Sequence, residues 1–503
     1  MKKTLLTLTV LLTSFGLLGQ VQLGTNLLNE NTGDGAGRSI DISDNGRVVV
    51  VGAPAAVSAI NAGIFIRGGH VRTHGYNGVH WTAGADFDAE EGGDNFGNAV
   101  TMNDDASLIA CGAPSGRTAG VGYVHVYLAQ GDPNTPGGYI RYDGNELEGE
   151  TGTSGFGRSL DMNGDGSRLI VAGNNYVKVF EKTSLGDPWL QIGQTLQGES
   201  GSDNFGIDVA ISSNGNRIVV GNSLSDIGTT NAGYARVYDL VGNTWTPIGG
   251  DITDGFGDNA GAGVDIASNG SRIAVSFPGD DGNGLNAGVV RTYFLNGGVW
   301  TQIGNDMQGS GNGDGFGSSG NAGSIDMSQS GQFIAIGSQS GVGNLTGYVK
   351  VYQMPTTTGT TTWSQIGTTI FGTASGDRFG YSVAINDDMS FDTRVAMGAP
   401  EAGNSGTSGN SRVYEYNSVV LSIDDIANTS NTLTLYPNPT NDILYIKGTT
   451  PKKVTVFDAQ GRLVKEYLNP TDHISFGTLQ RGMYLLQIID HTNALSNAKI
   501  IVQ

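Results

Sequence analysis

A unit of roughly 60 residues recurs along most of this chain, and it constrains the fold more than any other feature. Its clearest copy spans residues 94–114, where two short apolar segments flank a polar turn and glycines stand at both corners. This pattern predicts a β-hairpin. The last apolar residue before the turn recurs at intervals of 49 to 61 residues, at Ile42, Met102, Met162, Ile211, Ile266, Met327 and Ile385.

Each unit has room for about four short strands. Turn dipeptides that tolerate positive φ, such as Asn45-Gly46 and Asp165-Gly166, follow the first strand, and a nearly continuous apolar run follows the turn. Such runs are typical of strands that are buried on both faces. We therefore predict an all-β protein whose residues 20–416 form a seven-bladed β-propeller.

Composition agrees with a turn-rich β protein. The 81 glycines and 13 prolines make up less than a fifth of the 503 residues, below the share of roughly 25–30% that indicates disorder. The formal net charge is −20, which argues against binding to nucleic acid or to anionic lipid. The single cysteine, Cys111, lies in an apolar run and is expected to be a buried thiol.

The N-terminus has the layout of a secretory signal peptide, predicted for residues 1–19. Lys2 and Lys3 precede an apolar run that is too short for a transmembrane helix, and no later stretch is long enough for one. The seventh unit lacks a last strand of the type WTQIG, whereas residues 20–24 (QVQLG) match that strand with Gln20 in the tryptophan position. We expect this N-terminal strand to close the propeller.

Composition changes after Tyr416, where a linker is expected over residues 417–431. Seven alternating runs in residues 432–503 then predict a small, immunoglobulin-like β-sandwich. The motifs LYPNPTNDILYI, VTVFDAQGRLVKE and LQRGMYLLQIID resemble the C-terminal sorting domain of type IX secretion substrates in Bacteroidetes. The residues that carry this resemblance are Asn438, Pro439, Gly461, Gly482, Met483 and Tyr484. It implies handling by the type IX machinery through residues 432–503, after Sec export, and a location outside the cell or on the outer-membrane surface. An ordinary sandwich domain that binds carbohydrate or protein is the alternative.

The repeats resemble the FG-GAP repeats of bacterial propellers and of integrin α-chains. Two units carry both motifs: Phe96-Gly97 with Gly112-Ala113-Pro114, and Phe379-Gly380 with Gly398-Ala399-Pro400. Partial copies are Gly52-Ala53-Pro54, Phe156-Gly157, Phe205-Gly206, Phe256-Gly257 and Phe316-Gly317. Extra residues follow Gly257 and Gly317, so irregular blade ends are expected in the fifth and sixth units.

In integrin-type repeats the hairpin turn holds calcium through a DxNxDGxxD loop. Asp161, Asn163 and Asp165 fit the first six positions, but the ninth is Leu169 rather than a carboxylate. Calcium needs six to eight oxygens, so these residues are a weak candidate site and a plain hairpin turn is the favoured interpretation. Calcium is the cofactor that these turns bring into consideration.

Other candidate sites are weaker. Asp280, Asp281 and Asn283 lie in one of the variable loops after the GAP position, residues 223–232, 278–287 and 401–410, which should share one propeller face. A zinc site at His70, His74 and His80 is conceivable. One tryptophan per unit, at Trp189, Trp245, Trp300 and Trp363 and more loosely Trp81, indicates packing rather than a sugar-binding ladder.

The function expected from these features is non-catalytic. No recognised hydrolase, metalloprotease or phosphate-binding motif occurs in the chain. We expect a secreted or surface-displayed propeller for adhesion, with an extracellular protein or a glycan as its partner. The alternative is a secreted enzyme that degrades polysaccharide or protein, with an active site at the propeller axis.

Overall fold

The structure is a computed structural model that divides the chain into two compact units. The propeller unit spans Gln20–Tyr416, and the C-terminal residues from Asn417 belong to the other unit. The described residues are 18–28, 33–60, 64–117, 120–133, 138–142, 146–150, 154–200, 203–226, 229–318, 324–341, 345–354, 362–386, 393–401, 409–418, 434–437, 440–447, 450–458, 463–477, 479–491 and 495–502. The signal-peptide prediction up to residue 17, the linker from residue 419, Asn438, Pro439 and Gly461 lie outside them.

The described residues of the propeller unit form seven sheets of four or five strands, one for each predicted repeat, and a two-stranded hairpin. In sheet order the strands are β3 (Ser39–Ile42), β4 (Val48–Ala53), β7 (His70–Tyr76), β8 (Trp81–Asp88); β9 (Ala99–Met102), β10 (Leu108–Ala113), β11 (Tyr123–Ala129), β12 (Tyr139–Arg141) with β13 (Leu147–Glu148) also on β11; β14 (Ser159–Met162), β15 (Arg168–Gly173), β16 (Tyr176–Glu181), β17 (Leu190–Gln197); β18 (Phe205–Ile211), β19 (Arg217–Asn222), β20 (Tyr234–Val241), β21 (Thr244–Ile252); β22 (Val264–Ile266), β23 (Arg272–Phe277), β24 (Val289–Asn296), β25 (Val299–Gln308); β26 (Ile325–Met327), β27 (Phe333–Ser338), β28 (Tyr348–Gln353), β29 (Ser364–Phe371); and β30 (Val383–Ile385), β31 (Thr393–Ala399), β32 (Asn410–Ser418), β1 (Leu18–Gln22) with β2 (Leu27–Leu28) also on β32. The hairpin is β5 (Val57–Ile60) with β6 (Ile64–Arg67).

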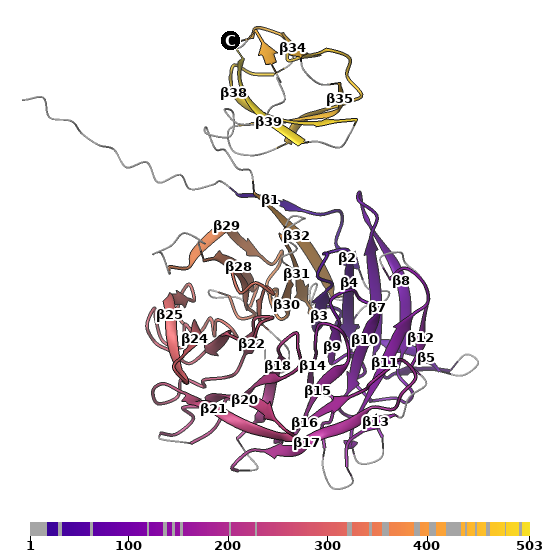
Figure 1. Cartoon of the computed structure of the whole chain (residues 1–503), viewed down its shortest axis with the longest axis vertical. Helices are drawn as coiled ribbons and strands as arrows, with labels where there is room; N and C mark the ends of the chain where they lie inside the picture. Colours follow the sequence, from indigo (N-terminus) through magenta and orange to yellow (C-terminus); the bar gives the residue numbers. More distant parts are fainter. Residues whose placement is uncertain are drawn as a thin grey trace, which may run out of the picture. The chain divides into compact units, whose positions relative to one another are not determined.

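The first strands of the seven sheets surround an axis. In chain order β3, β9, β14, β18, β22, β26 and β30 each contact the next, and β30 contacts β3, which closes the ring. Figure 1 shows β3, β9, β14, β18, β22 and β30 near the middle of the unit, with fourth strands such as β8, β21 and β25 at its rim. The predicted all-β propeller is thus confirmed.

The ring closes through the N-terminal strand. β1 lies at the outer edge of the sheet that contains β30, β31 and β32, and the backbone N–H of Leu23 donates to the carbonyl of Val413 at 2.8 Å. The side chain of Gln20 faces Gly367 and accepts a hydrogen bond from the backbone N–H of Thr368 at 2.6 Å. These contacts place Gln20 where the sequence match predicts it.

The tryptophans occupy the corresponding place in other sheets. Trp245 packs on Gly193, and Trp300 packs on Gly249, in each case on the fourth strand of the preceding sheet. A Cβ atom at Gly193 would lie 2.5 Å from the Trp245 ring, so the glycine is required for this contact. Trp189, Trp245, Trp300 and Trp363 are all buried, as a packing role predicts.

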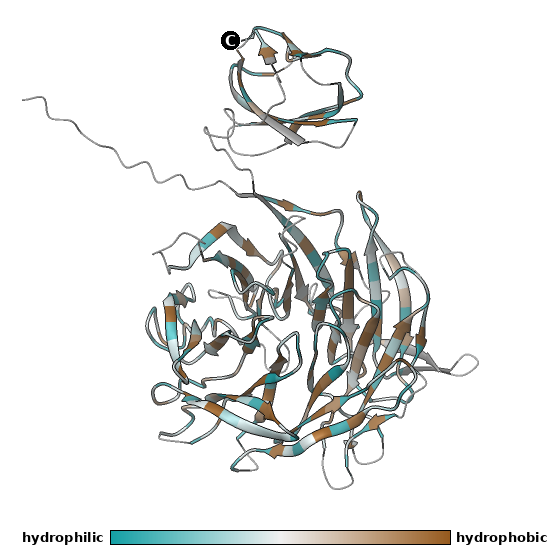
Figure 2. Ribbon diagram, in the orientation of Figure 1, coloured by the Kyte–Doolittle hydropathy of each residue, from teal (hydrophilic) through white to brown (hydrophobic). Residues whose placement is uncertain are grey.

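The hydrophobic core lies between neighbouring sheets. Val177 and Val179 of β16, for example, pack in one cluster with Val209 of β18 and Val220 of β19. Figure 2 shows hydrophobic residues along the strands of every sheet in the view. Cys111 belongs to one of these clusters and is fully buried, and burial raises the pKa of its thiol.

Glycines let the sheets approach closely. A Cβ atom at Gly52 would lie 2.1 Å from the carbonyl oxygen of Gly97, and one at Gly112 would lie 2.1 Å from that of Gly157. Gly97 itself has φ of +85°, a conformation that favours glycine. The glycine of the Gly-Ala-Pro motif in one repeat therefore contacts the glycine of the Phe-Gly motif in the next repeat.

The fifth sheet corrects one sequence assignment. Phe256-Gly257 is not the structural equivalent of the other Phe-Gly pairs, since Phe256 is 75% exposed whereas Phe96 and Phe316 are fully buried. Ala260-Gly261 takes their place: a Cβ atom at Gly221 would lie 2.0 Å from the carbonyl oxygen of Gly261. The missing aromatic ring comes from Phe277, which is fully buried on β23.

The C-terminal unit contains seven strands in the described residues, as predicted. They form the sheets β33 (Thr434–Tyr436), β34 (Ile443–Lys447), β37 (His473–Ser475) and β36 (Leu463–Leu468), β35 (Pro451–Asp458), β38 (Gly482–Asp490), β39 (Leu495–Val502). Leu444 and Ile446 of the first sheet pack with Val454, Leu486 and Ile500 of the second. Two sheets over one apolar core make a β-sandwich.

Candidate functional sites

The calcium candidate residues form a hydrogen-bonded turn. Asn163 Oδ1 accepts from the backbone N–H of Arg168 at 2.7 Å, and Asn163 Nδ2 donates to Asp165 Oδ1 at 2.9 Å. Asp165 Oδ1 also accepts from the N–H of Ser167 at 2.8 Å. Although burial opposes it, these contacts lower the pKa of Asp165. A calcium ion would have to displace these bonds, and calcium binding here stays a prediction.

Asp161 points elsewhere. Its Oδ1 accepts from the N–H of Met162 at 2.8 Å, and its Oδ2 accepts from the N–H of Ile211, on the next sheet, at 2.8 Å. The same turn geometry recurs without a carboxylate in the position of Asp165: Asn214 Oδ1 accepts from the N–H of Asn216 at 2.9 Å. The hairpin therefore has a structural use that is independent of any metal.

Four aspartates stand at one position of the first strands and line a cavity of about 130 Å³ at the axis: Asp41, Asp161, Asp265 and Asp326. Each accepts a hydrogen bond from a backbone N–H of the following repeat, donated by Met102, Ile211, Met327 and Ile385 respectively. Asp208 links its sheet to the next in a similar way, through the N–H of Val264 at 3.0 Å. The carboxylates thus join neighbouring inner strands.

Burial shifts the titration of these groups. It raises the pKa of Asp41, Asp208 and Asp265 to about 7 and that of Asp161 to about 6, although backbone hydrogen bonds oppose the shift. Burial and the neighbouring Asp265 raise the pKa of Asp326 as well. Carboxyl groups with raised pKa values around a cavity are typical of active sites, but structural networks have the same property.

Backbone hydrogen bonds join neighbouring repeats around the axis, at the turns that follow the first strands. Backbone N–H groups of Asp44, Asp104, Gly164, Ser213 and Ser268 each donate to the carbonyl of the equivalent turn in the next repeat, at 2.9 to 3.1 Å. Gln329 Nε2 crosses from the sixth repeat to Asp104 Oδ1 in the second at 2.8 Å. The cavity lies at this end of the axis, since Asp104, Ser213 and Gln329 of the turns are among the residues that line it.

A second recurring feature is a basic side chain or histidine at the third position of the third strand. The row consists of Arg72, His125, Lys178, Arg236, Arg291, Lys350 and Arg412. Several lie over an aromatic ring: Lys350 is 5.2 Å from the ring centre of Phe316, and Arg412 is 4.5 Å from that of Phe379. In the fifth sheet Arg291 lies 4.7 Å over Phe277, the ring that replaces the missing phenylalanine. Each of these three basic side chains packs on an aromatic ring of its own repeat.

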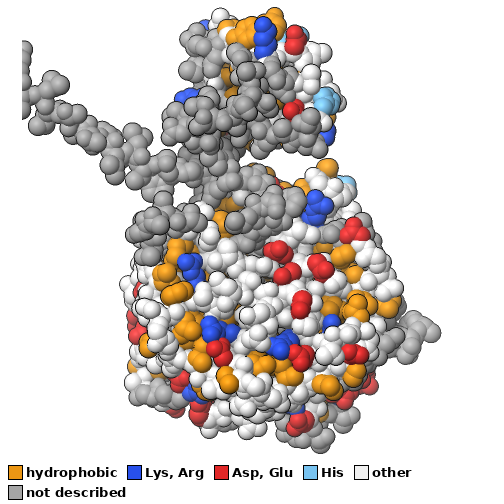
Figure 3. All heavy atoms as spheres, in the orientation of Figure 1, with side chains coloured by type: hydrophobic (Ala, Val, Ile, Leu, Met, Phe, Trp, Pro, Cys, Tyr) orange, Lys and Arg blue, Asp and Glu red, His pale blue; other side chains and the backbone are white. Residues whose placement is uncertain are grey.

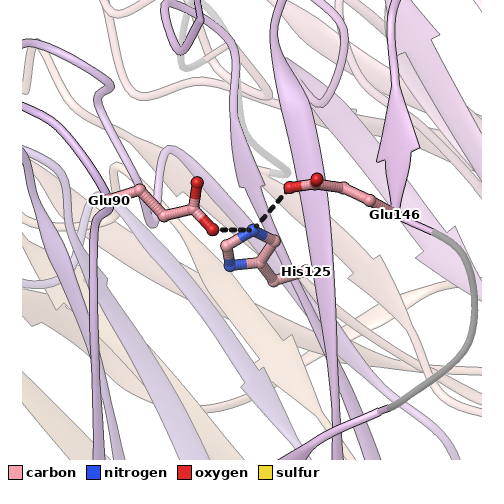
Figure 4. A group of neighbouring side chains, drawn as sticks. All are labelled: Glu90, His125 and Glu146. Carbon is pink, nitrogen blue, oxygen red and sulfur yellow. Dashed lines mark hydrogen bonds and ion pairs between the residues drawn. The ribbon is translucent and has the colours of Figure 1, made fainter.

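The second sheet carries histidine in this row, and two glutamates converge on it. Glu90 Oε1 and Glu146 Oε1 each lie 3.3 Å from His125 Nε2 (Figure 4). Arg141 contacts both glutamates, at 2.6 and 2.9 Å, and Arg117 forms ion pairs with both as well. One histidine and two carboxylates resemble a metal-ligand set.

The surroundings of His125 favour an ion-pair network over a metal. His125 is only 3% exposed, and its Nδ1 has no hydrogen-bond partner among the described residues. A metal on Nε2 would leave a buried Nδ1–H without the acceptor that metal-bound histidines normally have. Burial lowers the pKa of His125 to about 3, so the neutral ring can donate from Nε2 to the glutamates.

The zinc hypothesis for the first unit gains no support. Among the described residues, the clusters of three possible ligands include none of His70, His74 and His80. Burial lowers the pKa of His74 to about 4, and His80 Nε2 lies 3.1 Å from the side-chain nitrogen of Asn77. The histidines belong instead to the packing of β7 and to its hairpin turn.

A further acidic cluster joins one loop after the GAP position to the connection between β21 and β22. Asp280, one of the predicted residues, lies with Asp254 and Asp258 so that their carboxylate oxygens are within 4.8 Å of one another. Arg291 Nη2 lies 2.9 Å from Asp280 and 3.1 Å from Asp306, and Arg291 also pairs with Asp254. Asp281 and Asn283 are not in this cluster. Most of the loop at residues 401–410 lies outside the described residues.

Sequence reasoning named Asp161 only as a calcium ligand, and it missed both the axial position of the aspartates and the basic row. The aspartates recur at a fixed place in short strands, as in SIDI, SLDM and VDI, and the basic residues recur at the third place of the third strands, as in YVKV and YARV. Aligning the strands residue by residue, rather than the turns alone, would have found them.

Comparisons with known proteins decide the nature of the C-terminal unit. Residues 434–503 match the family described as the secretion system C-terminal sorting domain. This is the type IX sorting domain that the sequence motifs resemble. It indicates handling by the type IX secretion machinery and export to the cell surface or the extracellular space. Among the described residues there is no helix with the length and hydrophobicity that a membrane crossing requires.

The propeller unit has no comparably informative match. No curated protein sequence matches the chain. Two solved structures, both of candidate 6-phosphogluconolactonases, are similar to it: one from Bacteroides fragilis at 12% identity and a TM-score of 0.45, covering 68% of this chain and 85% of that one, and one from Bacteroides uniformis at 11% and 0.44, covering 68% and 87%. Both similarities are too low to carry an activity over to this protein.

Proposed function

We propose that the protein is an exported, non-catalytic propeller that binds an extracellular protein or glycan through the loop face, and that its repeats are of the FG-GAP type. The loop face is defined here as the connections between second and third strands together with those between successive sheets. The sorting domain supports delivery to the outside, where adhesion would take place.

The observation that carries the non-catalytic proposal is the use of the axial carboxylates. Asp41 accepts from the N–H groups of Ile42 and Met102, both at 2.7 Å, so each of its oxygens already has a backbone partner. Asp161 has the equivalent pair. A general base or nucleophile needs an oxygen that is directed at substrate, whereas these oxygens hold neighbouring sheets together.

The loop face has the character of a binding surface. Its segments are joined side by side, since the N–H of Gly257 donates to Thr230 at 3.1 Å and that of Gly279 donates to Asp258 at 3.1 Å. The segments are variable between repeats, while the strands beneath them are alike. Variable loops on a rigid scaffold commonly form binding sites.

An enzyme with an axial active site is the second candidate. It is favoured by one specific observation, namely that four aspartates with raised pKa values border the axial cavity. In that case Asp→Asn substitutions at the axis would abolish turnover of a polysaccharide or protein substrate without a matching loss of stability.

The test is an array of glycans and extracellular proteins probed with the purified full chain, with and without calcium, and with mass spectrometry of each bound ligand. Binding of an unaltered ligand that is weakened by changes in the loops at residues 223–232 and 278–287 is expected. A cleaved ligand, or binding that is indifferent to those loops, would contradict the proposal.

A further inference from the structure

The fifth repeat exposes an aromatic ring that the other repeats bury. Phe256 is 75% exposed, because Ala260-Gly261 fills the Phe-Gly place and Phe277 supplies the core ring. Leu285, in the next loop of the same repeat, is 65% exposed. Since neither side chain is needed in the core, two large apolar groups are left on the loop face without a partner in the described chain.

The loops that carry these side chains are held in place. The N–H of Leu285 donates to Asn312 Oδ1 at 3.0 Å, and the N–H of Gly313 donates to the carbonyl of Leu285 at 2.8 Å. Gly255 donates to Asp258 Oδ2 at 2.6 Å. The insertion around Phe256 is joined to the loops on both sides by the backbone hydrogen bonds of Gly257 and Gly279. A fixed apolar group costs less conformational entropy on binding than a mobile one.

The charged residues of the loop segments around these apolar groups are all acidic. The loop segments 223–232, 253–263 and 278–287 contain five aspartates and no lysine or arginine. Asp254 and Asp281 are exposed. The nearest basic group, Arg291, is already paired with Asp254, Asp280 and Asp306. Figure 3 shows acidic, basic and hydrophobic side chains interspersed on the propeller face in view.

We propose that Phe256, Leu285 and the surrounding carboxylates of Asp254, Asp280 and Asp281 form a docking surface for a cationic protein segment with apolar side chains. We call this group the Phe256 surface. The inference rests on the proposed binding function and specifies the partner of the same loop face. Lysine or arginine side chains would meet the carboxylates, while an apolar side chain would cover the phenyl ring and exclude water from it.

The charge pattern distinguishes this partner from a neutral glycan. A neutral sugar can stack on an aromatic ring and donate its hydroxyl hydrogen bonds to carboxylates, but it carries no charge that they would attract over a distance. A cationic segment is attracted by them over a distance of about 10 Å at 0.1 M salt. Its affinity should therefore fall as salt concentration rises, and glycan affinity should not.

The experiment compares the full-length protein with three variants, using a fluorescent peptide of four lysines and two leucines. Phe256→Ala removes the exposed ring. Phe294→Ala is its matched control, since Phe294 belongs to the same repeat, is 39% exposed, and lies near the end of β24 that is away from the loop face. Asp281→Asn removes one charge but keeps the acceptor that Asn286 N–H uses at 2.7 Å. A peptide with glutamate in place of lysine and the neutral sugar chitohexaose complete the probes.

We expect Phe256→Ala to weaken binding of the lysine-leucine peptide about tenfold, which corresponds to about 1.4 kcal/mol. Phe294→Ala should bind within twofold of the unaltered protein. Asp281→Asn should bind two- to threefold more weakly, with a shallower dependence on salt. Thermal unfolding of Phe256→Ala should match that of the unaltered protein because the ring is exposed.

Equal peptide binding by Phe256→Ala and the unaltered protein would overturn the inference. The cationic peptide would then bind only because the protein as a whole has a net charge of −20, and not through the Phe256 surface. Chitohexaose binding that is lost in Phe256→Ala, with peptide binding unchanged, would overturn it in favour of a glycan. Either result leaves the proposed binding function standing, whereas cleavage of a probe, seen by mass spectrometry, would refute that function itself.

Discussion

The axis and the loop face of this propeller use aspartate in opposite ways. At the axis, Asp41 and Asp161 recur at one position of the first strand and bind backbone N–H groups of two sheets. On the loop face, Asp254 and Asp281 occur once, are exposed and pair with one arginine or cap their own loop. A polar residue that recurs with the repeat belongs to the scaffold, whereas one that breaks the repeat is free for function.

The same distinction applies to aromatic and basic residues. Phe96, Phe316 and Phe379 recur and are buried, while Phe256 stands outside the repeat and is exposed. His125 looks like a metal ligand when viewed alone, but it occupies the place of an arginine or lysine in the other sheets. Comparing the repeats of this chain thus separates scaffold residues from the others, as comparing homologous proteins does in other families.

The largest effect is expected from breaking the ring of the scaffold. Deleting residues 20–24 removes β1 from its sheet together with the buried side chain of Leu23. Loss of one buried leucine alone costs about 2–5 kcal/mol, and an open sheet edge is left as well. We expect a large loss of stability in urea unfolding, with aggregation. A deletion variant as stable as the unaltered protein would show that the ring does not depend on this strand.

A smaller but still substantial loss is expected from Asp265→Ala at the axis. The substitution leaves the N–H groups of Ile266 and Met327 without acceptors, and each unsatisfied buried donor costs about 1–3 kcal/mol. Asp265→Asn keeps one acceptor oxygen and should lose less. Urea unfolding of both variants measures the difference.

The matched change on the loop face is Asp281→Ala, which should alter stability by less than about 0.5–1.5 kcal/mol, the net value of one hydrogen bond. If Asp281→Ala were as destabilising as Asp265→Ala, the contrast between axis and loop face would fail. If Asp265→Asn were fully stable but lost a measurable enzymatic activity, the axial enzyme would replace the binding propeller.

The repeat period and the turn dipeptides were sufficient to predict the propeller and the N-terminal closing strand, because both depend on local patterns that recur. They were not sufficient to place Phe256. The Phe-Gly pair at residues 256–257 fits the motif, but four residues further on Ala260-Gly261 makes the inter-sheet contact. The ring that replaces the missing phenylalanine, Phe277, lies on another strand. Only the packed structure shows that Phe277 fills the space that the small side chain of Ala260 leaves.

The pH dependence of stability should separate the two regions. Burial raises the pKa of Asp41 and Asp265 from the ordinary value of 3.8 to about 7 in the folded protein. The folded state therefore binds more protons than the unfolded state between about pH 4 and pH 7. This contribution to stability is fully present below pH 4 and is lost as the pH rises through 7.

We accordingly expect the urea midpoint to be higher at pH 5.5 than at pH 7.5. The carboxylates with lowered pKa values, such as Glu90 and Asp165, act in the opposite direction, but only below about pH 4.5, where such groups become protonated. Asp265→Asn should reduce the difference, and Asp281→Asn should leave it unchanged. A midpoint that rises from pH 5.5 to pH 7.5 would contradict the assignment of these protons to the axis.

The smallest effect is expected from calcium. Asn163 and Asp165 use their oxygens within the hairpin turn, and Asp161 directs both of its oxygens at backbone N–H groups. Since no carboxylate stands at the ninth position, we expect neither heat on calcium titration nor a change in thermal unfolding on addition of a chelator. Tight binding that disappears in Asp165→Ala and persists in Asp105→Ala, the equivalent aspartate of the second repeat, would instead assign this turn to function and remove it from the scaffold.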